Sequence, residues 1–437
     1  MKTVKILLSS ILLLGIVFAQ TPEQYITTGE TNMNAKQFSL AEEAFKKAIE
    51  LDPTFAPALF KLALLYLYTG DMENSQKFFR QAIDVDAENE EYRKEFERVN
   101  EINSMMSEGN RYLNSSELDA AYESFSKVLA KFPFFANAAY SMGGIKIRQK
   151  EYDAAITDFT KALEINPEFA NAQTAISTVV KNTFNDGNNL YRRGDLEGAL
   201  AAYNKVLEYD PNFFQACYQI GVILTKMGDV DQAIDYYQRA LDITPTFDKG
   251  WFGLGLAYKK IDNIEKALES FQKTIDVNPT YSKAYSGMGE IYLERQQYEQ
   301  AIDKLQMSIS IDPTYAQAME NLGAAYTKLE QWDKAVLELE KAVSFDPKSI
   351  NAWYNLALSY NKVKDCENAI RCSQKAVEIR ANYAPALIEL GVAYYCNGKG
   401  DRTRALNALE RARNDSRWRR IAEYEIDRIK NPDKYEE

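Results

Sequence analysis

Residues 278–294 read NPTYSKAYSGMGEIYLE, and residues 312–328 read DPTYAQAMENLGAAYTK. The second stretch begins 34 residues after the first and repeats its order of proline, tyrosine, small residues and aromatic residues. Prolines keep the same spacing within two runs, the first at Pro133 and Pro167 and the second at Pro211, Pro245, Pro279, Pro313 and Pro347. A fixed period of this length indicates a repeat architecture rather than one site that is used twice.

Other positions keep the same frame. A glycine, an alanine and a large apolar residue precede each proline at fixed distances, as Gly255, Ala267 and Phe271 precede Pro279. The frame returns near the N-terminus with Gly29, Ala41, Phe45 and Pro53, and more loosely near the C-terminus with Gly391, Ala405 and Leu409. The repeat therefore extends over most of the chain.

These residue types predict two amphipathic helices in each unit. Trp251, Leu254 and Tyr258 follow the spacing of one helical face. We expect Gly255 to lie where two helices approach closely, Phe271 to fill the space between them, and Pro279 to open the next helix. One helix pair leaves apolar surface exposed, so that successive pairs must stack. The predicted fold class is therefore an all-α solenoid.

The pattern resembles the tetratricopeptide repeat (TPR) family. The stretches WFGLGLAY from Trp251 and WYNLALSY from Trp353 carry the first half of its signature nearly complete, and about eleven units fit between Pro22 and Arg413. The resemblance implies a right-handed superhelical α-solenoid of about eleven helix pairs. It also implies a concave face, lined by the first helix of each pair, that holds other proteins.

Two inserts interrupt the period. The first adds 12 residues before Pro133, the second adds 10 before Pro211, and both carry apolar residues at helical spacing. We therefore predict continuous helices through Phe96 and Val179. The expected blocks are 20–100 with about two repeats, 101–177 with about two repeats and an extended first helix, 178–415 with about seven repeats, and 416–437 as a capping helix and tail. Each long helix either packs on its neighbours or forms a hinge or a partner-docking edge.

Composition disfavours several functions. The 63 acidic and 52 basic residues give a formal charge of −11, which disfavours nucleic acid and anionic membranes as main partners. The absence of histidine removes imidazole-dependent catalysis and most zinc sites. Glu265 and Glu269 represent the carboxylate pairs that acid–base chemistry would need, but they lie on a predicted solvated helix face. We expect no catalytic residue, no metal site and no cofactor.

Residues 1–19 resemble a secretory signal peptide. Lys2 and Lys5 precede the apolar run from Ile6 to Phe18, and Ala19 suits the cleavage position. We therefore predict export to the periplasm or cell envelope, with secretion from the cell as the alternative destination. A second alternative is that the segment is not cleaved and anchors the protein in the membrane. No later segment is longer or more apolar, so we expect no transmembrane segment after cleavage.

The four cysteines divide by their place in the repeat. Cys217 occupies the position of Trp251 and is expected to be buried and inert. Cys366 opens a second helix and Cys396 closes the next first helix, so that they either form a disulfide or remain two thiols. The spacing from Cys366 to Cys372 matches no metal motif.

The C-terminal segment after the repeats is predicted to cap the solenoid. Trp418, Ile421, Ile426 and Ile429 give an apolar stripe. A basic cluster lies beside it, formed by Arg411, Arg413, Arg417, Arg419 and Arg420. The alternative is a docking patch for an acidic surface.

The TPR resemblance also implies a partner-binding groove. It places aromatic residues on the concave face at Phe60, Tyr140, Tyr218, Phe252 and Tyr354, amides at Gln219, Asn321 and Asn355, and lysines at Lys249 and Lys283. Aromatic faces and amides suit an extended polypeptide. Asn321 and Asn355 resemble two rungs of the family's asparagine ladder, whereas Ile26 and Glu30 do not match its carboxylate clamp. Alternatively, the aromatic residues pack between successive helices.

The sequence thus predicts a non-enzymatic scaffold of the cell envelope that binds protein or peptide partners. A self-assembling structural array is one alternative, and an accessory subunit of an envelope enzyme or secretion complex is another. The oligomeric state and the identity of the partner stay open.

Overall fold

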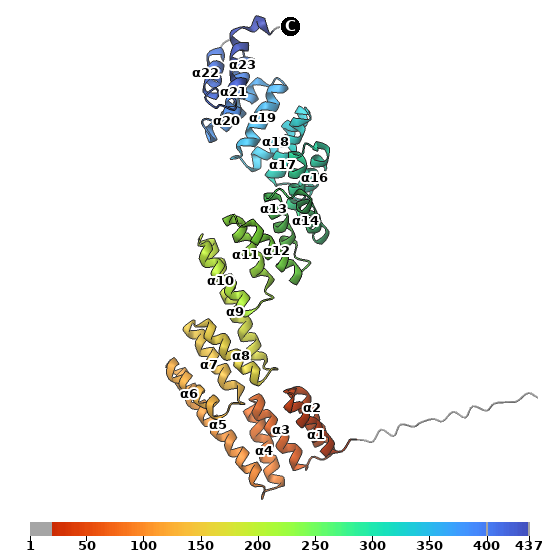
Figure 1. Ribbon diagram of the computed structural model, residues 1–437, viewed down its shortest axis with the longest axis vertical. Helices are drawn as coiled ribbons and strands as arrows, with labels where there is room; N and C mark the ends of the chain where they lie inside the picture. Colours follow the sequence, from red (N-terminus) through yellow and green to blue (C-terminus); the bar gives the residue numbers. More distant parts are fainter. Residues whose placement is uncertain (1–19, 399–400, 436–437) are drawn as a thin grey trace, which may run out of the picture. The chain divides into compact units, whose positions relative to one another are not determined.

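The computed structural model describes residues 20–398 and 401–435, and these ranges hold 23 α-helices and no strand (Figure 1). The predicted all-α class is therefore confirmed. The signal peptide expected at residues 1–19 lies outside the described residues. Internal contacts divide the chain into two units, Met1–Pro211 (unit 1) and Asn212–Glu437 (unit 2).

Unit 1 contains five helix pairs. Its helices are α1 (Pro22–Asn34), α2 (Phe38–Leu51), α3 (Ala56–Thr69), α4 (Met72–Val85), α5 (Glu90–Asn114), α6 (Leu118–Lys131), α7 (Ala136–Gln149), α8 (Tyr152–Ile165), α9 (Ala170–Arg192) and α10 (Leu196–Tyr209). Each odd-numbered helix packs against the even-numbered helix that follows it, and each pair packs against the next.

Unit 2 contains six helix pairs and a further helix. They are α11 (Phe214–Met227), α12 (Val230–Ile243), α13 (Asp248–Lys260), α14 (Ile264–Val277), α15 (Ser282–Glu294), α16 (Tyr298–Ile311), α17 (Ala316–Lys328), α18 (Trp332–Phe345), α19 (Ile350–Lys362), α20 (Cys366–Ile379), α21 (Ala384–Cys396), α22 (Arg402–Ala412) and α23 (Arg419–Lys430), followed by the 3-10 helix η2 (Pro432–Lys434). The eleven pairs and the final helix match the number expected from the repeat.

The core of each pair forms where glycine and a large apolar side chain meet. Phe271 of α14 is fully buried, and a Cβ atom added to Gly255 of α13 would lie only 2.7 Å from its ring. A Cβ added to Gly287 of α15 would also come within 3.0 Å of this ring. Phe271 therefore fills the space between α13 and α15, and the expected roles of Gly255 and Phe271 are confirmed.

Pro279 does not open a helix, contrary to the expectation from sequence. α14 ends at Val277 and α15 begins only at Ser282, so Pro279 lies in the turn between them. The Asn278 side chain organises this turn, because its Oδ1 accepts hydrogen bonds from the backbone N–H of Thr280 at 3.1 Å and from the Thr280 hydroxyl at 2.9 Å. The fixed φ of proline suits such a turn as well as it suits a helix start.

The two inserts lengthen the first helices of their pairs. α5 runs without a break through Phe96, and α9 does so through Val179, so the predicted continuous helices are confirmed. In α5 the side chains of Val99 and Ile102 are fully buried, and Val179 is fully buried in α9. The long helices thus contribute to the core. The division into three blocks stays a prediction.

Unit 1 also contains contacts between helix pairs that are not neighbours in sequence. Glu168, in the turn after α8, accepts hydrogen bonds through Oε2 from the backbone N–H (2.9 Å) and the hydroxyl (2.6 Å) of Ser39 in α2. The Lys36 ammonium donates to the Glu164 carbonyl oxygen. Tyr68 of α3 stacks on Phe134, just before α7, with ring centroids 4.6 Å apart. We call the bonds that Ser39 and Lys36 make with Glu168 and Glu164 the α2–α8 contact.

Helix α23 covers the end of the last helix pair. Ala422, Ile426 and Ile429 are buried against α21 and α22, as expected of a capping helix, whereas Ile421 of the predicted stripe is 45% exposed. Two arginines of the basic cluster bond within the unit: Arg411 donates to the Ala381 carbonyl, before α21, at 2.6 Å, and Arg413 pairs with Glu410 at 2.7 Å. Within residues 20–398 and 401–435, no helix combines the length and apolarity that crossing a membrane requires.

Candidate partner-binding site

The first helices of successive pairs lie closer together than the second helices. In unit 1, α1 contacts α3, α3 contacts α5 and α7 contacts α9; in unit 2 the same holds from α15 through α17, α19 and α21 to α23. Among the described residues, the even-numbered helices contact one another less. Each unit therefore curves toward its odd-numbered helices, whose shared surface we call the first-helix face.

The five predicted aromatic residues lie between successive helix pairs. Each ring packs against a ring from the second helix of its own pair, from the start of the next first helix, or from both. The nearest centroid distances are 4.5 Å for Phe60–Tyr92, 5.2 Å for Tyr140–Phe169, 5.1 Å for Tyr218–Phe247, 5.1 Å for Phe252–Tyr281 and 6.0 Å for Tyr354–Tyr383.

Burial limits what these rings offer to a partner. Phe60 is only 4% exposed, whereas the other four are half-buried. Burial raises the pKa of Tyr354 to about 12, so that its hydroxyl is neutral at pH 7. The ring–ring contacts agree with the alternative prediction from sequence, in which these aromatic residues pack between successive helices. Their direct contact with a partner stays a prediction.

Two of the predicted amides lie on adjacent first helices. Asn321 of α17 is 8% exposed, and its Oδ1 accepts a hydrogen bond from the Gln317 side chain at 3.2 Å. Its Nδ2 is buried without a hydrogen-bond partner. Asn355, 34 residues later, is half-buried on α19, which contacts α17. These two residues therefore occupy equivalent positions on neighbouring helices.

The remaining predicted residues are spread along unit 2. Gln219 is half-buried on α11, while Lys249 of α13 and Lys283 of α15 are exposed. Phe60 and Tyr140 belong to unit 1. The structure places Asn321 on α17 and Tyr354 and Asn355 on the contacting helix α19, but the ten predicted residues form a series of positions rather than one cluster.

A cavity of about 570 Å³ lies between α19, α21 and α23 and was not predicted from the sequence. Its polar lining includes Asn361 of α19, Glu389 of α21, and Glu425 and Arg428 of α23. The Asn361 side-chain amide donates to Glu389 Oε2 at 2.8 Å and to the Glu389 carbonyl at 2.9 Å. We call this space the C-terminal cavity.

The repeat period would have pointed to the C-terminal cavity. Glu389 follows Asn355 by 34 residues, so it takes the next place in the series Asn321, Asn355. At this place the side chain changes from an amide to a carboxylate. The sequence alone predicts that an acidic residue on a first helix is solvated, but Glu389 bonds to Asn361 of α19 and shares the cavity lining with Glu425 and Arg428 of α23.

The carboxyl groups of the C-terminal cavity have unusual electrostatics. Burial raises the pKa of Glu389 to about 7, although the hydrogen bond from Asn361 acts in the opposite direction. Burial also raises the pKa of Glu425, against the attraction of Arg428. Because desolvation penalises the charged form, a group that brings positive charge into the cavity would stabilise both carboxylates.

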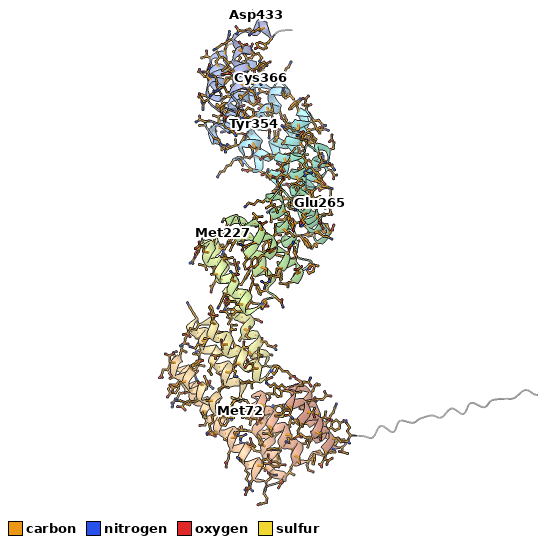
Figure 2. All side chains as sticks on the ribbon, viewed as in Figure 1. Met72, Met227, Glu265, Tyr354, Cys366 and Asp433 are labelled. Atoms are coloured by element: carbon orange, nitrogen blue, oxygen red, sulfur yellow. A yellow bond between two sulfur atoms is a disulfide. The ribbon has the colours of Figure 1, made fainter. Side chains whose placement is uncertain are left out.

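A disulfide lies beside the C-terminal cavity. Cys396 lines the cavity and is joined to Cys366, labelled in Figure 2, with Cα atoms 5.8 Å apart. The thiols of Cys217 and Cys372 are free and buried. Burial raises the pKa of Cys217, and it raises that of Cys372 to about 12, so both thiols stay protonated at neutral pH.

The described residues provide no group of histidine, cysteine or carboxylate side chains that could hold a metal ion. The residues described above offer a partner hydrogen bonds, charge and apolar contact. These are the interactions through which helical arrays bind polypeptides.

Comparison with solved structures gives partial likenesses. The chain is 30% identical to MamA over 37% of this chain and 95% of that chain, with a TM-score of 0.34. It is 19% identical to YrrB, a TPR protein with an unusual peptide-binding site, over 43% and 96% of the two chains, with a TM-score of 0.36. For the Cut9–Hcn1 tetramer of the APC/C, the identity is 15%, the coverage 93% and 96%, and the TM-score 0.46. No curated protein matches the sequence.

Family comparisons cover most of the repeats. Models described as TPR repeat match residues 187–228, 289–330 and 325–364. Models described as tetratricopeptide repeat match residues 25–55, 56–89, 106–168, 214–247, 249–281, 270–303 and 350–383. Together these matches span more than half of the chain. The chain belongs to the tetratricopeptide repeat family.

Proposed function

We propose that the protein is a non-enzymatic scaffold of the cell envelope that holds extended segments of other polypeptides along its first-helix face. Membership of the TPR family supports a role in protein–protein interaction. The net charge of −11 and the absence of histidine favour a protein partner over nucleic acid and a binding role over catalysis.

The observation that carries this proposal is the buried Nδ2 of Asn321, which has no hydrogen-bond partner. An unpaired buried donor costs about 1–3 kcal/mol, so a polypeptide carbonyl that reaches it would recover free energy. Asn355 offers a second amide on the neighbouring helix. An extended polypeptide has unpaired carbonyl and N–H groups along its whole length, and a side-chain amide can bond both.

We expect Asn321→Ala combined with Asn355→Ala to weaken peptide binding about tenfold or more. Each lost hydrogen bond contributes about 1 kcal/mol, and two together exceed the 1.4 kcal/mol that corresponds to a tenfold change. The measurement is fluorescence anisotropy with a pool of labelled nonapeptides of degenerate sequence.

The matched control is Gln300→Ala with Asn407→Ala. It removes two exposed amides from the second helices α16 and α22. The control should bind the pool like the unchanged protein. A double variant at Asn321 and Asn355 that keeps its helical circular dichroism and its melting temperature, yet binds the pool as tightly as before, would contradict the proposal.

Export gives a separate prediction. The protein recovered from the envelope fraction of its host should have the intact mass of a chain that begins at Gln20, because Ala19 suits the cleavage position. Intact mass spectrometry of fractionated cells measures this directly. Recovery of the full-length chain from the soluble cytoplasmic fraction would defeat the envelope assignment and leave the peptide-binding proposal standing.

A further inference from the structure

We propose that the C-terminal cavity receives the cationic side chain of a lysine or arginine carried by the bound polypeptide. This inference rests on the proposed polypeptide binding and adds a preference to it. The cavity lies on the first-helix face of unit 2, because α19, α21 and α23 contact one another in succession.

The lining of the cavity suits a long side chain with a charged end. Ile388, Val392 and Tyr395 provide apolar surface, while Asn361, Glu389 and Glu425 provide oxygen atoms. Lysine and arginine side chains combine an apolar stem with a charged end group. The stem packs on apolar surface, while the charged group pairs with polar or acidic atoms. A volume of about 570 Å³ holds such a side chain.

Hydrogen bonding in the cavity is incomplete. Asn361 Oδ1, Glu425 Oε2 and Arg428 Nε are buried and make no hydrogen bond within the described part of the chain. Glu425 Oε2 lies 2.9 Å from Arg428 Nη2, so the two form an ion pair, but the geometry is not that of a hydrogen bond. Asn361 Oδ1 and Glu425 Oε2 therefore lack a hydrogen-bond donor, and the Arg428 Nε–H lacks an acceptor.

A basic residue of a polypeptide supplies this combination. An ammonium group has three N–H donors and a guanidinium has five, which serve the oxygens of Asn361, Glu389 and Glu425. The backbone carbonyl of the same peptide is an acceptor for Arg428 Nε. An anionic side chain would instead meet two carboxyl groups at close range, and like charges repel.

The cations already present serve Glu425 but form no ion pair with Glu389 among the described residues: Arg428 pairs with Glu425, and Lys362 acts on both carboxyl groups only through its charge. The Arg428 guanidinium lies over the Tyr395 ring at 5.9 Å from the centroid, beside Glu425. The Lys362 ammonium lies over Trp332, a residue outside the cavity lining, at 5.7 Å. Lys364 is exposed. Within the described part of the chain, the side chain that hydrogen-bonds to the Glu389 carboxylate is Asn361.

The preference should depend on pH. The titratable groups that line the cavity are Lys362 and Lys364 at the end of α19, Tyr395 on α21, Glu425 and Arg428 on α23, and Tyr435 after η2. Burial raises the pKa of Glu389 to about 7, so this carboxyl is ionised at pH 8 and largely protonated at pH 6. A cation favours the ionised form, and its binding therefore weakens as the pH falls through about 7, approaching tenfold per unit.

The test compares four pools of labelled nonapeptides that are degenerate except at the central position, which is arginine, lysine, glutamine or glutamate. Binding to the full chain is measured by fluorescence anisotropy at pH 8 and pH 6. The variant is Glu389→Gln with Glu425→Gln. The matched control, Glu367→Gln with Glu423→Gln, removes the same charge from exposed positions outside the lining.

We expect the arginine and lysine pools to bind at least tenfold more tightly than the glutamine and glutamate pools at pH 8, with a smaller difference at pH 6. The variant should bind all four pools alike, while the control keeps the preference. Should the double variant fail to fold, Glu389→Gln alone and the pH profile of the unchanged protein make the same comparison.

The outcomes separate this inference from the proposed function. Equal binding of the four pools by the unchanged protein overturns the cationic preference and leaves polypeptide binding intact. Tighter binding of the glutamate pool overturns it in favour of an anionic side chain. Failure of every pool to bind overturns both proposals.

Discussion

Replacement of Phe271 by alanine is expected to lower the free energy of unfolding around α13–α15 by about 3–5 kcal/mol. Phe271 is fully buried, and its ring faces Gly255 on one side and Gly287 on the other. Neither glycine has a side chain that could move into the space that the ring leaves. The substitution therefore creates a cavity in addition to the loss of apolar burial, and both effects destabilise the packing.

Hydrogen–deuterium exchange of the full chain, read out on peptides from α13, α14 and α15, measures this loss locally. Urea denaturation followed by circular dichroism gives its effect on the whole molecule. The control is Phe345→Ala, because Phe345 ends α18 with 49% of its surface exposed and should cost less than about 0.5 kcal/mol. Equal exchange in the two variants would contradict the packing role of Phe271.

Reduction of the bond between Cys366 and Cys396 should destabilise the folded state by about 3–4 kcal/mol. The two residues are separated by 30 positions, and the loop between them contains α20 and most of α21. In the chain-entropy model, opening a loop of this length lets the unfolded chain sample more conformations. Because α21 contributes Glu389 to the C-terminal cavity, the geometry of that cavity should loosen as well.

Urea denaturation with and without dithiothreitol measures the effect, and Cys366→Ser provides the control, because reductant should then change nothing further. Mass labelling of thiols under native conditions should show two newly reactive cysteines after reduction, since Cys217 and Cys372 are buried. An unchanged unfolding midpoint in fully reduced protein would contradict this expectation.

The helix pairs could be predicted from the sequence because close packing restricts residue types at fixed positions. Gly255 and Phe271 illustrate this, since a small and a large residue must meet wherever two helices approach closely. Pro279 was misplaced because proline suits both a turn and a first helical turn, and the hydrogen bonds of Asn278 decide between them.

The candidate site could be predicted only in part. The repeat frame located the first-helix positions, including Asn321 and Asn355, but it left open whether Tyr354 and its equivalents face a partner or pack between helices, and the structure places them against neighbouring rings. Glu389 was missed because the repeat frame says nothing of α23, the final helix, whose Glu425 and Arg428 line the same cavity. Residue types and their spacing define a single repeat. Whether a side chain is buried depends also on the helices that pack against that repeat.

The α2–α8 contact has a consequence for how unit 1 folds. In a linear repeat protein each unit touches only its neighbours, so that folding spreads from any point and the ends fray first. The bonds between Ser39 and Glu168 join residues 129 positions apart. They form only after the intervening pairs are in place, which raises the contact order of unit 1 and slows the last step of its folding. Once formed, they tie the first helix pair to the fourth, so that the N-terminal end of the unit unfolds together with its interior.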